Sequence, residues 1–259
     1  NVLTVASGEA HTCALHAGGQ VTCWGDNSRL QLGSSAVSER SYAPVEVPGL
    51  PANLTVLAAG ADHTCAATTA GEAWCWGDNA YGALGDGLAG VGLRSPPVRT
   101  RRLALPVRAL TAGKGHTCAR VGDGAVECWG FNASGALGDD TALDSTVPVR
   151  PVGLKADMRQ VRAGTDFTCA LSAEGRVRCW GLNEAGQLGD GTRVHRAAPV
   201  DVSGLANEVV DLGTGVTSTC TVLRDGRVQC WGANAAGQLG DGTQTERAGP
   251  VVVLGLEAP

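Results

Sequence analysis

The chain of 259 residues consists almost entirely of one sequence unit that occurs five times. The stretch 8–13, Gly-Glu-Ala-His-Thr-Cys, returns with variations at 60–65, 113–118, 164–169 and 215–220, at intervals of 51 to 53 residues. In every copy a second cysteine follows ten positions after the first, and Trp-Gly follows that second cysteine. A repeat of this length indicates an array of similar structural units rather than unrelated domains.

Each copy contains four short segments typical of β-strands. Residues 55–60 form an apolar run that ends in glycine, and residues 63–67 follow directly. Residues 177–180 alternate, so that Val177 and Cys179 share one face of a strand. The fourth segment opens with Pro-Val, and a proline, which has no amide donor, suits an outer edge strand. Four strands in about fifty residues predict an all-β fold, a β-propeller of four-stranded antiparallel blades.

The two ends of the chain complement each other in spacing. At all four internal junctions, sixteen residues separate the proline that opens a fourth segment from the glycine that ends the next first segment. The last copy stops nine residues after Pro250, and residues 2–8 match the segment it lacks. We therefore expect one domain over residues 1–259, a closed five-bladed ring in which the N-terminal strand completes the C-terminal blade. The repeats then run approximately over 8–60, 60–113, 113–164, 164–215, and 215–259 plus 1–8.

The fourth copy carries a recognisable motif. It begins Gly-Thr-Asp-Phe-Thr-Cys-Ala-Leu at residue 164 and ends Cys-Trp-Gly-Leu-Asn-Glu-Ala-Gly-Gln-Leu-Gly-Asp-Gly-Thr at residue 192. This motif resembles the regulator of chromosome condensation repeat, and all five copies share it. The resemblance implies a propeller, usually of seven blades, and functions as different as nucleotide exchange with histone binding, ultraviolet perception and β-lactamase inhibition. Ala10, Asp62 and Gly115 stand where the photoreceptor's sensing tryptophans would be, so light sensing is not expected.

The ten cysteines fall into five pairs of identical spacing. Residues ten apart in a hairpin centred midway between them face each other across two strands, at a distance that a disulfide can span. The predicted disulfides are Cys13–Cys23, Cys65–Cys75, Cys118–Cys128, Cys169–Cys179 and Cys220–Cys230. Five disulfides would indicate an extracellular, cell-surface or periplasmic location. Zinc binding, whose paired ligands usually lie two to four residues apart, and free thiols are the alternatives.

Other recurring residues allow a metal hypothesis and a structural one. The histidine of the motif recurs in three successive copies, as His11, His63 and His116. Three such nitrogens around a common axis could hold a metal, but Phe167 and Ser218 occupy the same position elsewhere, which favours a structural role. Gly-Asp-Gly runs at 85–87, 189–191 and 240–242 suit turns more than calcium loops. We interpret the tryptophan after each second cysteine as packing between blades, and we predict no cofactor and no bound metal.

Charge and motif content exclude several function classes. A net charge of −5 gives no general attraction for nucleic acid. No apolar stretch approaches the roughly 20 residues that span a bilayer, and with Asn1 first and no leader before it we read a mature or trimmed chain. Almost every conspicuous polar residue recurs with the repeat, and five equivalent copies cannot all be one active site. The sequence therefore predicts a binding protein, a monomer, rather than an enzyme.

One loop differs between the copies and is the predicted binding site. From the tryptophan to the next proline the spacing is nineteen residues in copies three to five, twenty in the first and twenty-one in the second. The candidate binding residues in this region are Arg40, Tyr42, Tyr81, Leu88, Val91, Leu93, Arg94 and Phe131. Aromatic and arginine side chains are common anchors of protein interfaces, so we expect a protein partner on the loop face of blades one and two. The alternatives are a loop that merely tolerates insertion, and a lectin with repeated glycan pockets between blades.

A basic cluster and two glycosylation sequons complete the candidates. Arg99, Arg101, Arg102 and Arg108 lie close together in the second copy, which lacks the Gly-Leu found at 49–50, 153–154 and 204–205. This cluster is either a patch for an acidic protein or polysaccharide, or a solvated edge. The sequons are at 53–55 and 132–134.

Overall fold

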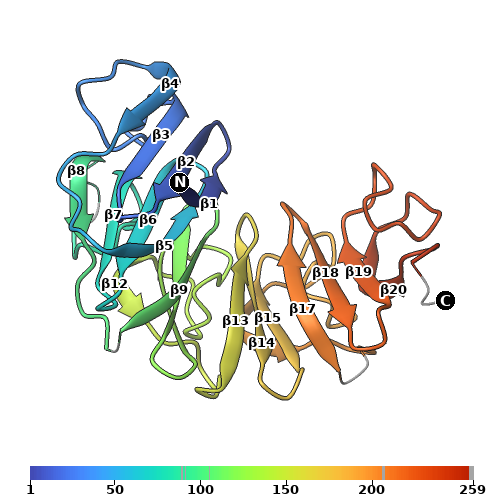
Figure 1. Cartoon of the computed structure of the whole chain (residues 1–259). Coiled ribbons are helices and arrows are strands. Elements are labelled where there is room, and N and C mark those ends of the chain that lie inside the picture. The colour runs from blue at the N-terminus through green and yellow to red at the C-terminus, as the bar shows by residue number, and fades with distance from the viewer. Residues whose placement is uncertain (89, 91, 105, 206–207, 257–259) are drawn as a thin grey trace.

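The computed structural model describes residues 1–256 except 89, 91, 105, 206 and 207, and these form five four-stranded antiparallel sheets (Figure 1). Blade one holds β1 (Val2–Ser7), β2 (His11–His16), β3 (Val21–Asp26) and β4 (Arg40–Glu46); blade two holds β5 (Leu54–Ala59), β6 (His63–Thr68), β7 (Ala73–Asp78) and β8 (Leu93–Arg99). Blade three holds β9 (Val107–Ala112), β10 (His116–Val121), β11 (Ala125–Gly130) and β12 (Ser145–Val149). Blade four holds β13 (Met158–Ala163), β14 (Phe167–Ser172), β15 (Val177–Gly181) and β16 (Arg196–Asp201); blade five holds β17 (Val209–Thr214), β18 (Ser218–Leu223), β19 (Val228–Gly232) and β20 (Arg247–Val252). The all-β fold with five four-stranded blades is confirmed.

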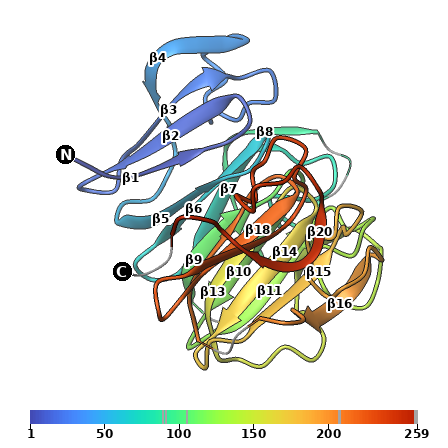
Figure 2. The ribbon, with the colours of Figure 1, turned by 90° about the vertical axis from the view of Figure 1, so that its right-hand side faces the viewer.

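Within each blade the strands follow sequence order from the inside outward. The inner strands β1, β5, β9, β13 and β17 contact one another from blade to blade, whereas the proline-containing strands β4 and β16 lie at the periphery (Figure 2). Proline is tolerated there because an outer edge needs no amide donor. Across the described residues no helix could cross a membrane.

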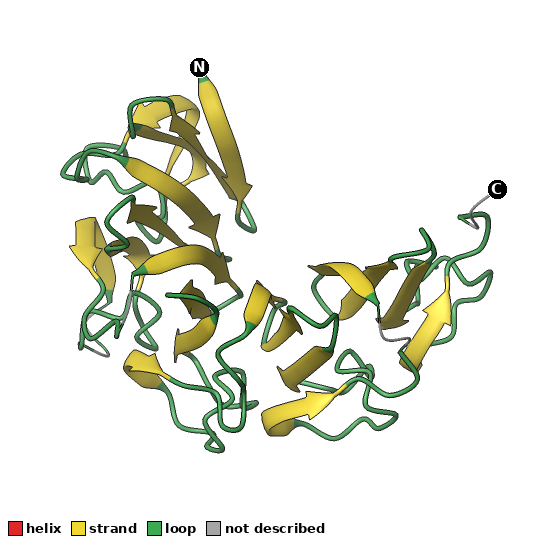
Figure 3. Ribbon diagram, turned by 60° about the horizontal axis from the view of Figure 1, so that its bottom comes forward, coloured by secondary structure: helices red, strands yellow, loops and turns green. Residues whose placement is uncertain are grey.

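The prediction that the N-terminal strand completes the C-terminal blade is wrong. β1 pairs with β2 of its own blade, from Val2 opposite His16 to Ser7 opposite Thr12. Blade five has its own inner strand, β17, paired with β18. The short turn at residues 8–10 leads the chain directly back along β1, so every blade, the first and the last included, begins with its own inner strand. The five blades form an open arc, with the N- and C-terminal blades at opposite ends (Figure 3).

All five predicted disulfides are present. In each hairpin the two cysteines are directly opposed, as Cys118 and Cys128 are in β10 and β11. The Cα atoms of every pair are 4.1 Å apart. The cysteines point into the blade cores, where they are buried, except that Cys220 of the last blade is partly exposed. The hairpin loop sets the register, and the register brings the sulfurs together.

Neighbouring blades are joined by a repeated pair of hydrogen bonds, which we call the latch. In blade two the Trp76 indole and the Thr64 hydroxyl both donate to the Gln31 carbonyl of blade one, at 2.9 and 3.1 Å. The later junctions repeat this with Trp129 and Thr117 on Ala83, Trp180 and Thr168 on Ala136, and Trp231 and Thr219 on Gln187. These four tryptophans are fully buried, as expected for packing between blades.

A recurring asparagine shapes the loop between the third and fourth strands. Asn183 is fully buried; its Oδ1 accepts from the Leu188 amide at 2.9 Å, and its Nδ2 donates to the carbonyls of Thr192 and Val194. The equivalents are Asn27, Asn79, Asn132 and Asn234. One side chain thus satisfies several backbone groups that the loop leaves unpaired.

Candidate functional site

The three recurrent histidines form bonds between blades. The distances from Nε2 to the threonine hydroxyl of the next blade are 2.8 Å for His11, 2.9 Å for His63 and 3.0 Å for His116. Since each of these hydroxyls donates its own proton to the latch carbonyl, Nε2 is the donor in each of the three bonds. Burial lowers the pKa of His63 to about 3 and those of His11 and His116 to about 4.

The geometry does not support the hypothesis that these three histidines bind a metal. Their Nε2 atoms are occupied, and in the described part of the chain no group of three or more His, Cys, Asp or Glu side chains could hold a metal. The inner turns of all five blades instead line a shallow axial depression of 530 Å³, made mainly of glycine, alanine and threonine.

The aspartates of the Gly-Asp-Gly runs organise turns. Asp241 accepts from the amide and hydroxyl of Thr243 and pairs with Arg247 at 2.8 Å. The Thr243 hydroxyl, and then Arg247, lower the pKa of Asp241 to about 2. Asp190 and Arg196 make the same ion pair in blade four.

Blade two uses Arg94 in this structural role. Its Nε lies 3.2 Å from Asp86 Oδ2, and its side chain is only 20% exposed. Asp86 is buried, with its Oδ1 accepting from the Leu88 amide and from Asn79 Nδ2. The two extra residues of this loop move the arginine from six to eight positions after the aspartate, yet the ion pair is kept.

The remaining candidate binding residues lie in separate places. Arg40 and Tyr42 belong to β4 of blade one and line a small cleft of 260 Å³, where Tyr42 is 89% exposed. Tyr81 and Phe131 come from blades two and three and meet each other. Leu93 begins β8, and Val91 lies outside the described residues. The structure therefore joins the candidates in pairs rather than in one patch.

The Tyr81–Phe131 pair sits on the loop face of blades two and three. The ring centroids are 4.9 Å apart in an edge-to-face arrangement, a favoured geometry for aromatic pairs. The Phe131 amide donates to the Gly115 carbonyl, which places the pair beside the turn that precedes β10. Tyr81 is 49% exposed, so it presents an aromatic surface to solvent.

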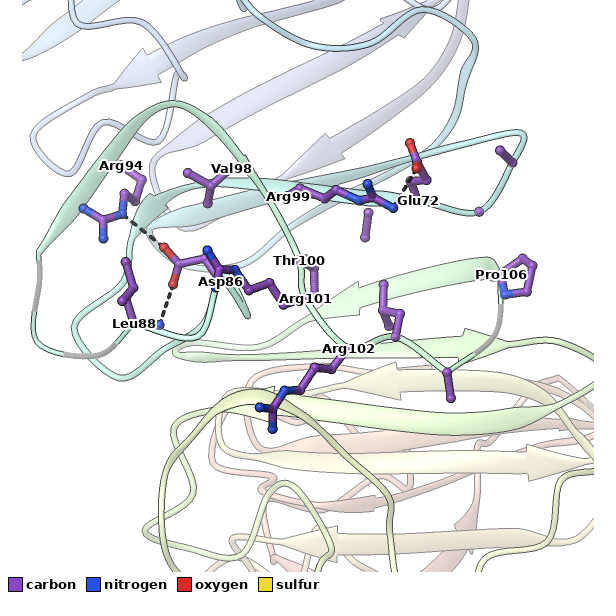
Figure 4. A pocket seen from close by; sticks show the side chains of 15 residues that line it. Glu72, Asp86, Leu88, Arg94, Val98, Arg99, Thr100, Arg101, Arg102 and Pro106 are labelled. Carbon is purple, nitrogen blue, oxygen red and sulfur yellow. Dashed lines mark hydrogen bonds and ion pairs between the residues drawn. The ribbon is translucent and has the colours of Figure 1, made fainter.

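A cleft of 940 Å³ runs along the outer side of blade two (Figure 4). It is lined by β8, the β6–β7 hairpin, Asp86 and Leu88 of the following loop, and residues 100–104 and 106 on the way to blade three. Arg94 and Arg99 are each paired with a carboxylate, Asp86 and Glu72 respectively. Arg101 and Arg102 also line the cleft and make no side-chain hydrogen bond or ion pair with any residue that the structure describes.

The cleft includes residues that the sequence interpretation missed. Leu103 packs against the core shared by blades two and three, as Leu50 does at the previous junction. Leu50 lies ten residues before Gly60, and Leu103 lies ten residues before Gly113, the glycine at the equivalent position. This shared spacing would have identified Leu103. Arg108, the fourth member of the basic cluster, is exposed on β9 and lies outside the lining.

The two sequons differ in accessibility. Asn132 is fully buried, and its side chain is used in its loop, so it offers no acceptor for a glycan. Asn53 is exposed before β5.

Comparisons with known proteins agree with this architecture. The model of the RCC1-like domain matches residues 1–258. The chain is 31% identical over 256 residues to the ultraviolet-B receptor UVR8 of Arabidopsis thaliana, covering 97% of this chain and 58% of that protein. It is 30% identical to the E3 ubiquitin-protein ligase HERC2 of Homo sapiens over 98% of this chain but only 5% of that protein.

Solved structures show the same fold. Human WBSCR16 superposes with a TM-score of 0.86 at 23% identity, covering 97% of this chain and 67% of that chain. Yeast RCC1 (Prp20), in a crystal structure with Kap60, gives 0.84 at 20% identity, covering 98% and 64%. The chain thus spans little more than half of UVR8 and about two thirds of these structures. Together with the repeated motif and the five blades, these matches show that the chain belongs to the family of RCC1-like domains.

Proposed function

We propose that this chain is a non-catalytic protein-binding scaffold that acts as a monomer in an oxidising compartment, at the cell exterior or in the periplasm. Its partner binds on the loop face of blades two and three, around Tyr81 and Phe131. The observation that carries this proposal is the edge-to-face contact between exposed Tyr81 and partly buried Phe131. The two aromatic residues stand at positions where the other copies of the repeat have no aromatic residue.

The aromatic pair has the properties of an interface anchor. Rings that already pack on each other lose little conformational freedom when a partner covers them, and aromatic side chains dominate many interface energies. Leu88, about half exposed, adds apolar surface from the lengthened loop of blade two. Tyr42 and Arg40 on blade one would be a separate, peripheral contact.

The hairpin disulfides support the proposed compartment. Every blade has one, and disulfides persist where thiols are not kept reduced. The match to the ligase HERC2 covers only 5% of that protein, so this likeness gives no reason to place ligase chemistry in this domain. Yeast RCC1, a fold relative, was solved bound to Kap60.

Capture of a partner tests the proposal. The oxidised chain is immobilised and exposed to extracellular proteins of its source, and any captured protein is purified and titrated against three forms. The Tyr81→Ala, Phe131→Ala double variant should weaken binding at least tenfold, because interface anchors often contribute 2 kcal/mol or more, or about 30-fold. A control variant, Val194→Ala with Val216→Ala, trims exposed apolar side chains on blades four and five and should bind normally.

Two results would contradict the proposal. If the Tyr81→Ala, Phe131→Ala variant bound the partner as tightly as the control variant, the partner would not bind at the loop-face site. Binding of glycans at several equivalent sites, with no protein captured, would replace the scaffold with a lectin.

A further inference from the structure

The turn that leads from the outer strand of each blade to the next blade has a different residue in blade two. The fifth residue after the proline that opens the outer strand is Gly49, Gly153, Gly204 or Gly255 in the other four blades, and Arg102 in blade two. All five have left-handed backbone, with φ of 60° at Arg102 and 70° to 78° at the glycines. The turns also share a hydrogen bond, from the amide of Arg101, Val152, Ser203 or Leu254 to a glycine carbonyl of the preceding loop at 2.8–2.9 Å. Arg102 therefore replaces a glycine within an unchanged turn.

Nothing within the described fold compensates for this replacement. Left-handed backbone favours glycine and strains a residue that has a Cβ. At Gly153, Gly204 and Gly255 a Cβ would meet no atom within 4 Å. The position therefore requires left-handed backbone, and a side chain there gains no packing contact in return. The Arg102 side chain is exposed and has no polar partner among the described residues. Strain of this kind is typical of functional positions, which points to a role for the guanidinium outside the fold.

The charge of the cleft indicates what it would bind. Four arginines and two carboxylates line it, and the carboxylates are already used by Arg94 and Arg99. Two positive charges, on Arg101 and Arg102, have no ion-pair partner among the described residues, on a chain whose net charge is −5. Figure 4 shows Arg94 and Arg99 directed at their carboxylates, and Arg102 directed away from both.

We propose that the blade-two cleft binds an acidic peptide segment of a partner protein, whose carboxylates pair with Arg101 and Arg102. This rests on the proposed function and adds the chemistry of the partner. Arginine suits the role because its planar guanidinium binds a carboxylate through two parallel hydrogen bonds.

The cleft favours a peptide over a dense polyanion. Leu88, Val98 and Leu103 give it apolar walls that alternate side chains of an extended peptide can cover. A sulfated polysaccharide or nucleic acid would gain from only two free cations and would be repelled by the acidic remainder of the molecule. Pro96 and Pro97 in β8 remove two amide donors, so the peptide is held by side chains rather than added as a further strand.

Fluorescence anisotropy with a defined probe tests this. The probe is a fluorescein-labelled ten-residue peptide of alternating Glu and Leu, and its control has Gln in place of every Glu. Wild type should bind the Glu peptide at least about tenfold more tightly than the Gln peptide, as expected for charge-assisted hydrogen bonds. Arg102→Gly restores the residue of the other blades, so it should weaken binding about tenfold while the melting temperature stays the same or rises.

Two further variants complete the design. Arg101→Gln should also weaken binding, whereas Arg108→Gln, which removes the same charge outside the cleft, should not. The proposal is overturned if R102G binds the Glu peptide as wild type does, if the Glu and Gln peptides bind equally, or if a heparin hexasaccharide binds through Arg102 while the peptide does not.

The result is separable from the test of the proposed function. A partner that is still captured through Tyr81 and Phe131 by a protein whose cleft binds no acidic peptide would overturn the cleft assignment alone. Peptide binding that depends on Arg102, without any dependence of partner capture on the aromatic pair, would overturn the loop-face site alone.

Discussion

The motif histidine is used for packing and hydrogen bonding, and this makes the molecule sensitive to acid. A histidine in the unfolded chain has a pKa near 6.5, whereas burial lowers the pKa of His63 to about 3. Below pH 6.5 the unfolded chain therefore binds more protons than the folded one, so stability falls as the pH drops towards the folded-state pKa. Above pH 6.5 the histidines contribute no pH dependence.

Replacing His63 by Phe should reduce this acid sensitivity. Phe167 already fills the equivalent position in blade four, so the shape is compatible with the fold. Between pH 7 and pH 5 the variant should lose about 2 kcal/mol less unfolding free energy than wild type, measured by urea denaturation at each pH. Parallel pH profiles of the two proteins would show that His63 is not protonated on unfolding.

Arg94 shows why residue type alone does not identify a binding residue. An arginine in a lengthened loop is a reasonable interface anchor, but here it pairs with buried Asp86 as Arg196 pairs with Asp190. Arg94→Gln should therefore lower the free energy of unfolding by about 1–3 kcal/mol, because it leaves a buried carboxylate with one partner fewer. The matched control Arg101→Gln, in the same cleft without an ion pair, should change stability by less than about 0.5 kcal/mol. Equal effects on thermal or urea unfolding would contradict the structural role of Arg94.

At the scale of the blade, the latch should carry much of the stability between neighbours. Thr168→Val keeps the shape but removes the donor to Ala136 and the acceptor for His116. Leaving buried polar groups unpaired should cost about 2 kcal/mol. Thr12→Val is the control, because Thr12 belongs to the first blade and is partly exposed. Urea denaturation should separate the two variants, and equal losses would mean that the latch adds nothing.

The hairpin disulfides also give a prediction at the scale of the blade. Intact mass should show the oxidised chain ten hydrogen atoms lighter than the reduced chain, for its five disulfides. Replacing Cys118 and Cys128 together by Ala should lower the free energy of unfolding by about 2–3 kcal/mol, from the loop entropy regained by the unfolded state. A full set of thiols that react with iodoacetamide without prior reduction would contradict the pairing.

The blades could be predicted from the sequence because their determinants are local. Alternation with a period of two assigns each side chain to a face, and a fixed hairpin loop sets the register, so the opposition of Cys169 and Cys179 follows from spacing. The cleft could be predicted only in part. Its arginines are visible in the sequence, but their division into paired and free ones depends on Glu72 and Asp86, and Asp86 lies in another loop.

At the scale of the whole molecule, the sequence predicted the five repeated blades correctly, but it did not predict that they form an open arc. A sequence that repeats every 51 to 53 residues has no inherent starting point, so spacing alone fits a ring sealed by the N-terminal strand and an arc of complete blades equally well. The difference arises from the tight turn that pairs β1 with β2.

An open arc should unfold unevenly, because stability in a repeat array is the sum of blade terms and nearest-neighbour terms. Blade four has latches on both sides, through Trp180 and Gln187, whereas blade one, among the described residues, has a latch with blade two alone. Its inner strand β1 also exposes Val2 and Leu3. Amides of β2 should therefore exchange with deuterium at least about tenfold faster than those of β14, since the missing latch removes roughly 1–2 kcal/mol of local protection.

Hydrogen exchange measured at several protein concentrations checks this. Dilution controls for self-association, because an arc whose end faces met a second copy would gain protection in β2 as concentration rises. Uniform protection of β2, β10 and β14 at high dilution would contradict the arc, because it requires blade one to have a neighbour on both sides. The gradient itself would show that the strength of each junction, rather than a sealed ring, determines how this chain holds together.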